Sequence, residues 1–485
     1  MGAIVAVLNK KGEDAAETAV TMLEILKLRN VEAFGIGSPI TVKIEKSIEA
    51  LRNQDIKSSV VIGHAFSKIL ASDRPQPIKL ENATLVCEGR IYPTIKEISY
   101  IEDVARKLPQ SHEEAINTII KKTDAGLALV LAEPEKLIVG RDAMGVSPLY
   151  YGESTEVAAL ASELKALWKI GMTKARSFPP GHVALVNAHG SKFRPAKTLA
   201  YAGAKHITMQ KAVKKLQTLL RHSIKERVSG LKEVAIAFSG GLDSGLTAFL
   251  AKVAGVNVHL IHVSLANQPE IEYAKKAAEK LRMPIHVFVY NEKDVERVLP
   301  SVLWLIEEPS PVMASIGIPF YWAAEKAAEM QFKVMLAGQG ADELFGGYAR
   351  YLKDYARCGS GRVQRTILND IFSMYEANFE RDSKICNFHN VELRMPFATY
   401  QIAKFAMDLP LELKIESPSD MLRKLVLRRV AKNLGLPELI VGKPKRAIQY
   451  TTGTTKALKK LAKREGLSMK EYVQRIFQTT FKKMA

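Results

Sequence analysis

The chain has 485 residues, of which 47% are hydrophobic and 25% charged, and its formal net charge is +19. This composition excludes wholesale disorder, and the length suits two or three domains. No apolar run approaches the ~20 residues that a membrane span needs, so no membrane association is expected. The three cysteines, Cys87, Cys358 and Cys386, lie far apart, which excludes a disulfide framework and a zinc site and indicates a reducing, cytoplasmic setting.

The first 195 residues are predicted to form a layered α+β domain. Short apolar runs alternate with glycine and proline, which is typical of strands, and helices are predicted at Ala15–Arg29 and His112–Lys122. The start, Met1–Val7, is apolar but has no basic region, so it indicates a first strand and not a signal peptide. The predicted strands are Ala3–Val7, Ser59–Ile62, Ala83–Cys87, Leu127–Ala132 and His182–Asn187.

A linker is predicted from Pro195 to Met209, and a second domain follows it over residues 210–485. Its first half alternates helices with strands, which is the pattern of a doubly wound parallel sheet. From about Tyr348 the chain is predicted to be mostly helical. The predicted order before that point is helix Gln210–Val228, strand Glu233–Phe238, helix Leu246–Ala254, strand Val256–Val263, helix Ile271–Leu281 and strand Ile285–Tyr290.

A glycine-rich turn, Ser239–Ser244 (S-G-G-L-D-S), comes directly after the first strand of the second domain. Two glycines let the backbone turn sharply and present N–H groups to an anion, and a helix opening at Ser244 adds its positive N-terminal dipole. The hydroxyls of Ser239 and Ser244 are further donors. Because Asp243 would repel a bare phosphate, the loop indicates a phosphate bound together with Mg²⁺. A purely structural turn is the alternative.

This loop resembles the pyrophosphate loop of the N-type ATP pyrophosphatases, which cleave ATP between its α and β phosphates and adenylate a substrate oxygen. Three further segments resemble the asparagine synthetase family: Leu336–Tyr348 (L-A-G-Q-G-A-D-E-L-F-G-G-Y), Asn390–Phe397 (N-V-E-L-R-M-P-F) and Lys443–Gln449 (K-P-K-R-A-I-Q). The chain is therefore identified as a member of that family. The resemblance implies ATP contacts at Phe238, Ser239, Gly240, Gly241, Leu242, Asp243, Ser244, Val263, Ala337 and Gly338.

The resemblance also implies catalytic roles. Lys445 is expected to neutralise charge that develops on the adenylated carboxylate and the pyrophosphate. Asp342 is expected to hold one Mg²⁺ together with Asp243, since two carboxylates from neighbouring loops are common ligands of that ion.

The acceptor is expected to contact Gln339 and Glu343. Gln339 stands where the family has glutamate, and a neutral amide cannot act as a base. Either the nitrogen nucleophile arrives already neutral, or Glu343 or Glu307 takes its proton.

Another segment, Gly140–Tyr151 (G-R-D-A-M-G-V-S-P-L-Y-Y), resembles class II glutamine amidotransferase domains and implies an N-terminal nucleophile-type αββα sandwich in the first domain. Such domains use a cysteine directly after the initiator methionine, but Gly2 stands there. The R-G-P-D turn of the family becomes Ile36–Pro39, and its oxyanion-binding asparagine becomes Glu88. These losses predict that the domain keeps the shape without the glutaminase chemistry. A nucleophile from a partner chain or from a different chain start is the alternative.

The leading hypothesis is an ammonia-dependent asparagine synthetase, in which MgATP adenylates aspartate and ammonia then gives asparagine, AMP and pyrophosphate. The alternatives are an adenylating ligase for another carboxylate or a tRNA base, and a nucleotide-binding protein without turnover. Met421–Ala485 contains 17 Lys or Arg against three Glu, which indicates either a surface for phosphates or a set of solvated helices. Few aromatics lie among these charges, so a nucleic-acid partner is not expected but stays open, as does a homo-oligomer.

Overall fold

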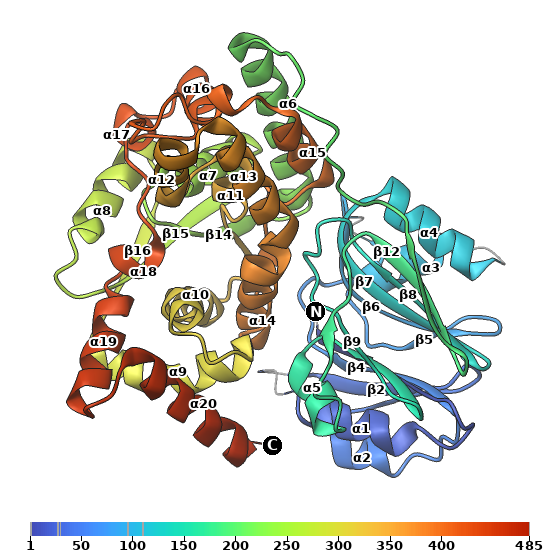
Figure 1. The fold of residues 1–485 in the computed structure, drawn as a ribbon. Coiled ribbons are helices and arrows are strands. Elements are labelled where there is room, and N and C mark those ends of the chain that lie inside the picture. The colour runs from blue at the N-terminus through green and yellow to red at the C-terminus, as the bar shows by residue number, and fades with distance from the viewer. Residues whose placement is uncertain (1, 27–28, 30, 95–96, 109–110, 485) are drawn as a thin grey trace. The chain divides into compact units, whose positions relative to one another are not determined.

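The computed structural model describes residues 2–26, 29, 31–94, 97–108 and 111–484. The chain divides into two compact units, and Figure 1 labels many of their elements. Unit 1 comprises Met1–Thr198, Asn387–Glu392 and Lys482–Ala485, and unit 2 comprises Leu199–Cys386 and Leu393–Phe481. In the part of the chain that the structure describes, no helix combines the length and the apolar composition that crossing a membrane requires.

Unit 1 contains two antiparallel sheets. The seven-stranded sheet has the order β11-β9-β10-β1-β4-β2-β3, and the six-stranded sheet has the order β13-β12-β8-β7-β6-β5. The strands of the first sheet are β1 (Gly2–Asn9), β2 (Ala33–Gly37), β3 (Val42–Glu45), β4 (Val60–Phe66), β9 (Tyr150–Glu153), β10 (Val157–Ala161) and β11 (Arg176–Ser177). Those of the second are β5 (Ile78–Lys79), β6 (Thr84–Tyr92), β7 (Asp124–Glu133), β8 (Lys136–Arg141), β12 (His182–Asn187) and β13 (Gly190–Pro195).

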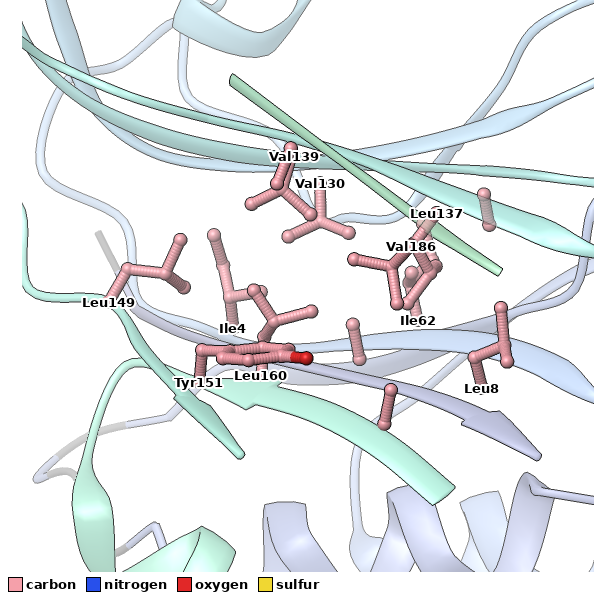
Figure 2. Packing of buried hydrophobic residues seen from close by; sticks show 14 of the residues in the cluster. Ile4, Leu8, Ile62, Val130, Leu137, Val139, Leu149, Tyr151, Leu160 and Val186 are labelled. Carbon is pink, nitrogen blue, oxygen red and sulfur yellow. The ribbon is translucent and has the colours of Figure 1, made fainter. Parts of the chain in front are cut away.

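The two sheets face each other through one apolar layer (Figure 2). Alternate residues of β1, Ile4, Ala6 and Leu8, point into this layer and meet residues such as Val130 and Val139 of the other sheet. The opposite faces are covered by helices, which bury the remaining residues of each strand. The predicted αββα sandwich is thereby confirmed.

Helices α1 (Ala16–Glu24), α2 (Ile48–Arg52) and α5 (Leu164–Lys169) pack on the seven-stranded sheet, and α3 (Tyr100–Ala105) and α4 (His112–Lys122) pack on the six-stranded sheet. The first of these helices ends at Glu24, five residues before the predicted end at Arg29.

The Gly140–Tyr151 motif of unit 1 forms a buried turn. The carboxylate of Asp142 accepts hydrogen bonds from the backbone N–H groups of Met144 at 2.9 Å and Val146 at 3.1 Å. The guanidinium of Arg141 donates to the carbonyl of Ser147 at 2.8 Å. These two charged side chains satisfy buried backbone groups that would otherwise have no partner, so the motif stabilises the fold.

Unit 2 is built on a five-stranded sheet with the order β16-β15-β14-β17-β18. Strand β14 pairs in parallel with β15 and with β17, and β15 pairs in parallel with β16. The strands are β14 (Glu233–Ala237), β15 (Asn257–Leu265), β16 (Ile285–Tyr290), β17 (Val334–Leu336) and β18 (Glu392–Arg394). The helices that precede and connect them are α6 (Met209–Val228), α7 (Leu242–Val253), α8 (Glu270–Leu281), α9 (Glu292–Ile306) and α10 (Pro311–Glu329).

The strand order reverses between β14 and β17. The chain moves outward from β14 through α7 and α8, then returns across the sheet through α9 and α10. Because parallel crossovers are right-handed, the outward and returning helices cover opposite faces, which confirms the predicted doubly wound sheet. Ligands of such sheets bind outside the carboxyl ends of the strands where the order reverses. This rule points to the loops after β14 and β17.

The rest of unit 2 is mostly helical, as predicted. Its elements, the last of which continues into unit 1, are α11 (Ala341–Phe345), α12 (Ala349–Cys358), α13 (Ser360–Met374), the π-helix η1 (Tyr375–Phe379), α14 (Glu380–Phe388), α15 (Tyr400–Asp408), the 3-10 helix η2 (Leu411–Leu413), α16 (Leu425–Asn433), α17 (Glu438–Val441), α18 (Ile448–Thr451), α19 (Thr454–Arg464) and α20 (Met469–Met484).

One buried lysine of unit 2 has no hydrogen-bond partner among the described residues. Lys414 follows η2, is fully buried, and leaves its ammonium nitrogen unpaired. Burial lowers the pKa of this amine from 10.5 to about 7, because the interior disfavours the charged form.

Stability should therefore rise with pH above neutrality. Between about pH 7 and 10.5 the unfolded chain holds a proton that the folded chain has released, and the slope approaches ~1.4 kcal/mol per pH unit. We expect Lys414→Met to remove this increase and to stabilise the chain near pH 7. Urea unfolding of both proteins from pH 7 to 10 measures the effect, with the exposed Lys459→Met as control. Equal pH slopes in wild type and Lys414→Met would contradict the assignment.

Candidate active site

The glycine-rich turn connects β14 to α7 at the carboxyl edge of the unit 2 sheet. Gly240 has a φ of +69°, and a Cβ there would lie 3.1 Å from Ala274 Cα, so this position requires glycine. The hydroxyls of Ser239 and Ser244 are 3.2 Å apart. Helix α7 begins inside the motif, at Leu242, and not at Ser244 as predicted. Hydroxyl groups and the first N–H groups of the helix therefore converge, as phosphate binding requires.

The loop after β17 lies against this turn. A Cβ at Gly338 would lie 2.8 Å from Asp243 Cβ, so only glycine lets the two loops approach this closely. A Cβ at Gly347 would overlap the carboxylate of Asp342. The glycines of the second motif thus bring the carboxylates of Asp243 and Asp342 together.

Four charged side chains meet where these loops touch. The ammonium of Lys424 lies 2.6 Å from Asp243 Oδ2 and 2.6 Å from Asp342 Oδ1. The ammonium of Lys445 lies 2.7 Å from Asp342 Oδ2 and 3.9 Å from Asp243 Oδ2. The two positive and two negative charges balance, which makes their burial tolerable. We call this group the four-charge cluster.

The cluster fixes the protonation states of Asp342 and Lys445. Although burial opposes ionisation of Asp342, the ammonium groups of Lys424 and Lys445 outweigh it and hold the pKa of this carboxyl well below its usual range. Burial likewise opposes the charge on Lys445, but Asp342 and Asp243 outweigh it and raise the pKa of this amine. Lys445 therefore stays cationic at every physiological pH, as charge neutralisation of a phosphate requires.

Lys424 reaches the cluster from a strained backbone. Both Arg423 and Lys424 have positive φ, +52° and +55°, which is uncommon for residues with side chains and concentrates at functional sites. The guanidinium of Arg423 holds this segment by donating to Gly347 O at 3.0 Å and to Lys445 O at 3.1 Å. Part of the C-terminal basic excess thus belongs to the site and is not a solvated surface.

Other cations of the C-terminal region lie on the surface. Lys460 and Arg464 of α19 both pair with Glu292, and Arg475 of α20 pairs with Glu465. These exposed pairs contribute little to stability, and they neutralise part of the local charge.

The two carboxylates have the chemistry to hold Mg²⁺. Asp243 and Asp342 converge on one point and offer the oxygen ligands that this ion prefers. That point is taken by the ammonium of Lys424, so a metal bound between the two carboxylates would require Lys424 to move.

A cavity of about 1070 Å³, a volume that includes its open mouth, extends along these loops. Its apolar wall includes Ile261, Ile316 and Phe320, which suits an aromatic base. Among the described residues, ten of the predicted site residues line it: Phe238, Ser239, Asp243, Ser244, Val263, Ala337, Gly338, Gln339, Asp342 and Lys445. Four others do not: Gly240, Gly241, Leu242 and Glu343.

The far end of the cavity holds a polar network around Gln339. The amide nitrogen of Gln339 donates to Asp382, and Arg381 clamps the same carboxylate with contacts of 2.7 and 3.0 Å. Glu343 accepts from Tyr348, and from Asn378 at 2.6 Å. Burial raises the pKa of Glu343, and nearby Asp342 adds to this shift.

The predicted proton acceptors both lie away from the cavity. Glu343 is buried behind its partners Tyr348 and Asn378, which line the cavity. Glu307 pairs with Lys384 at 2.7 Å and is also buried. Neither carboxylate lines the cavity, so the structure does not place either beside a bound nucleophile.

Comparison with known proteins gives matches over both units. A model of the asparagine synthase family matches residues 215–361 and 357–482, more than half of the chain. A model of the glutamine amidotransferase domain matches residues 65–169.

The chain belongs to the asparagine synthase family.

Its relatives carry corresponding names. A putative glutamine-hydrolyzing asparagine synthetase of Methanocaldococcus jannaschii is 29% identical over 97% of each chain. A probable glutamine-hydrolyzing asparagine synthetase of Acanthamoeba polyphaga mimivirus is 25% identical over 77% of this chain and 73% of the relative's chain. The structure of NMN synthetase from Francisella tularensis matches 58% of this chain and 97% of its own, with 15% identity and a TM-score of 0.28. The family membership makes this chain a carbon–nitrogen ligase, and we refer to it as the synthase.

Unit 1 of the synthase is packed where its amidotransferase relatives would carry a nucleophile. A Cβ at Gly2 would lie 1.7 Å from Ala65 O and 2.7 Å from His64 Cε1. His64 Nε2 pairs with Glu88 Oε1 at 2.6 Å, and both side chains are buried. The carbonyl of Gly2 accepts a hydrogen bond from Asn387 Nδ2 at 2.6 Å. The Ala65 carbonyl and the His64 ring thus occupy the space that a side chain at position 2 would need.

Several residues of the synthase site were missed from the sequence. Lys424 lies in a run of basic residues, and no local signal separates it from its neighbours. Arg381 and Asp382 lie on α14, outside the segments that carry the family resemblance. His262 of β15 lines the cavity next to the predicted Val263. The sequence contains one weak signal for His262, because this polar residue interrupts an apolar strand.

The two lysines of the four-charge cluster should respond differently to substitution. Lys424 is almost fully buried, whereas the side chain of Lys445 is 29% exposed. Lys424→Met leaves two partly buried carboxylates short of a counter-charge and should destabilise the synthase by at most roughly 3–5 kcal/mol. Lys445→Met should change stability far less but lower kcat by about 10²-fold or more.

Thermal unfolding and pyrophosphate release measure the two effects, with Lys459→Met as a charge-matched control on α19. An effect of Lys445→Met that is confined to KM for ATP would show ground-state binding instead of transition-state stabilisation.

Proposed function

We propose that the synthase uses MgATP to adenylate the side-chain carboxylate of aspartate and then forms asparagine from ammonia. A carboxylate oxygen attacks the α phosphorus while the bond from that phosphorus to the bridging oxygen breaks, so pyrophosphate leaves. Ammonia then attacks the acyl carbon, the bond to AMP breaks, and one proton is lost as the amide forms. The names of the relatives support aspartate as the acceptor.

The observation that carries this proposal is the four-charge cluster beside the hydroxyl-rich loop. Charge builds up on the pyrophosphate as it leaves, and the ammonium groups of Lys424 and Lys445, each paired with a carboxylate, lie beside the loop that is proposed to hold it. Preorganised charges of this kind need no rearrangement of solvent during the reaction. The Ser239 and Ser244 hydroxyls and the start of α7 hold the remaining phosphate oxygens.

Asp243 and Asp342 are the proposed holders of Mg²⁺. When bound, this ion supplies charge neutralisation and polarises the phosphate oxygens. Lys424, displaced from the carboxylates, is then free to pair with the phosphates.

Gln339 is proposed to contact the nitrogen nucleophile or the ammonium of aspartate. Its amide nitrogen faces the carboxylate of Asp382, since an amide oxygen there would be repelled. The amide oxygen is the end left for the cavity, and it accepts hydrogen bonds from N–H groups. Gln339 thus orients the nucleophile without taking its proton.

Free ammonia is the proposed nitrogen source. Glutamine hydrolysis in this enzyme class needs an attacking thiolate, and Gly2 has no side chain. The buried His64–Glu88 pair and the contact between Gly2 and Ala65 O leave no room for one. Both features support a structural role for unit 1.

A second candidate function is the amidation of a different carboxylate. The basic side chains that line the cavity favour it. Among the described residues, Lys445 and Arg381 are the basic side chains other than histidine that line the cavity. Lys445 belongs to the four-charge cluster, and Arg381 is committed to Asp382. The α-carboxylate of aspartate would therefore find no uncommitted cation here, whereas an acceptor with a single carboxylate needs none.

Product analysis tests the proposed reaction. Incubation with MgATP, aspartate and ammonium should give asparagine, AMP and pyrophosphate in equal amounts, and Asp243→Ala should abolish this. Mass spectrometry of the products, repeated over a panel of carboxylic acids, identifies the acceptor. Pyrophosphate formation with another acid but not with aspartate would replace the leading function with the second candidate.

The nitrogen source is tested separately. The wild type should release no glutamate from glutamine, and neither Gly2→Cys nor Gly2→Cys/Glu88→Asn should gain this activity. Because a Cβ at position 2 overlaps Ala65 O, Gly2→Cys should also lose ~1–3 kcal/mol of stability to overpacking. Gly361→Ala is the control, since a Cβ at Gly361 meets nothing within 4 Å. Efficient glutamine hydrolysis by the wild type would refute the inactive assignment.

A further inference from the structure

One wall of the nucleotide cavity carries a buried histidine with an unused acceptor. His262 is 4% exposed and lines the cavity. Its Nδ1 lies 2.9 Å from the backbone carbonyl of Phe238. A carbonyl only accepts hydrogen bonds, so Nδ1 carries the ring proton and Nε2 presents a bare lone pair. Nε2 has no hydrogen-bond partner among the described residues.

A buried carboxylate lines the same cavity. Glu270 is 7% exposed and lies in the first turn of α8, directly after the loop that follows β15. It accepts one hydrogen bond, from Arg446 at 3.1 Å, and the side chain of Arg446 is 65% exposed. A carboxylate has room for several donors, so Glu270 retains acceptor capacity toward the cavity.

His262 and Glu270 determine which kind of ligand atom can bind at this wall of the cavity. Both are acceptors, because burial lowers the pKa of His262 and keeps its ring neutral. A buried acceptor without a donor is unfavourable, so the wall is complementary to hydroxyl or amino groups. Phosphate oxygens are excluded, since they also accept.

The position of the wall identifies which donors these are. In the proposed function the phosphates of ATP bind at Ser239–Ser244 and the base packs on the apolar wall, so the ribose hydroxyls are expected between these two places. In dinucleotide-binding sheets, an acidic residue beyond the second strand binds the ribose hydroxyls. Glu270 follows the second strand of this sheet along the chain, β15.

We propose that His262 and Glu270 accept hydrogen bonds from the ribose hydroxyls and so make the synthase selective for ribonucleotides over deoxyribonucleotides. This inference rests on the proposed use of ATP and adds the residues that recognise its sugar. Neither residue is a member of the four-charge cluster, and the role proposed for both concerns the sugar alone.

Binding of three nucleotides tests the inference. We expect isothermal titration to show that ATP binds the wild type about tenfold or more tightly than 2′-deoxyATP or 3′-deoxyATP. His262→Phe and Glu270→Gln should weaken ATP about tenfold but leave the affinity for at least one deoxynucleotide unchanged. Glu272→Gln, on the exposed side of the same helix, is the control for a change of charge and should bind like the wild type.

Each outcome decides the inference. Equal affinities of the wild type for all three nucleotides would overturn it, and this comparison does not depend on any variant folding. A uniform loss of affinity in His262→Phe or Glu270→Gln would also overturn it by showing a structural role. Ribose selectivity without pyrophosphate release would support the inference while refuting the proposed function, and absence of ATP binding would refute both.

Discussion

The approach of two carboxylates at the switch point of the unit 2 sheet is the constraint on which the rest of the site depends. Asp243 and Asp342 come from loops that approach each other because Gly338 has no side chain, and the absence of a side chain at Gly347 leaves room for the carboxylate of Asp342. Without counter-charges, the two carboxylates would repel each other and separate the loops. The ammonium groups of Lys424 and Lys445 prevent this. The four side chains that hold the two loops together are therefore also those whose charges are proposed to act in catalysis.

This arrangement also explains the strained backbone before α16. Lys424 must reach both carboxylates from one direction, and positive φ at two successive residues turns its side chain inward. The ion pairs and the hydrogen bonds of Arg423 offset the strain. In the proposed function, nucleotide phosphates compete with Asp243 and Asp342 for the same ammonium groups.

The fold was largely predictable because apolar periodicity and glycine turns are local signals. Strand β16 and helix α4 match their predicted ranges, and the strand–turn–helix around Ser239–Ser244 follows from its glycines. Helix α7 starts at Leu242, two residues before the predicted opening at Ser244 and four before the predicted range Leu246–Ala254, because the turn is already complete at Gly241. Lys424, Arg381 and Asp382 were missed because their roles arise only from long-range contacts, which no local pattern records.

In unit 1, too, a local sequence motif reports on the fold and not on the chemistry. The G-R-D turn carries the amidotransferase resemblance, yet Arg141 and Asp142 satisfy backbone groups inside the sandwich. Such residues preserve a fold without any reaction, whereas the space around Gly2 is filled by His64 and backbone. Resemblance at fold-stabilising positions is therefore compatible with loss of the chemistry.

Gln339 stands where the family has glutamate, and the neighbouring Asp382 explains this difference. A glutamate at this position would place a second carboxylate against Asp382, which already receives the amide of Gln339 and the guanidinium of Arg381. One guanidinium cannot neutralise two buried carboxylates, so the second would shift its pKa upward or move away. A glutamine avoids this repulsion and adds a hydrogen bond. A neutral residue at position 339 thus suits the carboxylate of Asp382. Because the amide nitrogen of Gln339 points to Asp382, its amide oxygen is left to accept hydrogen bonds from a ligand.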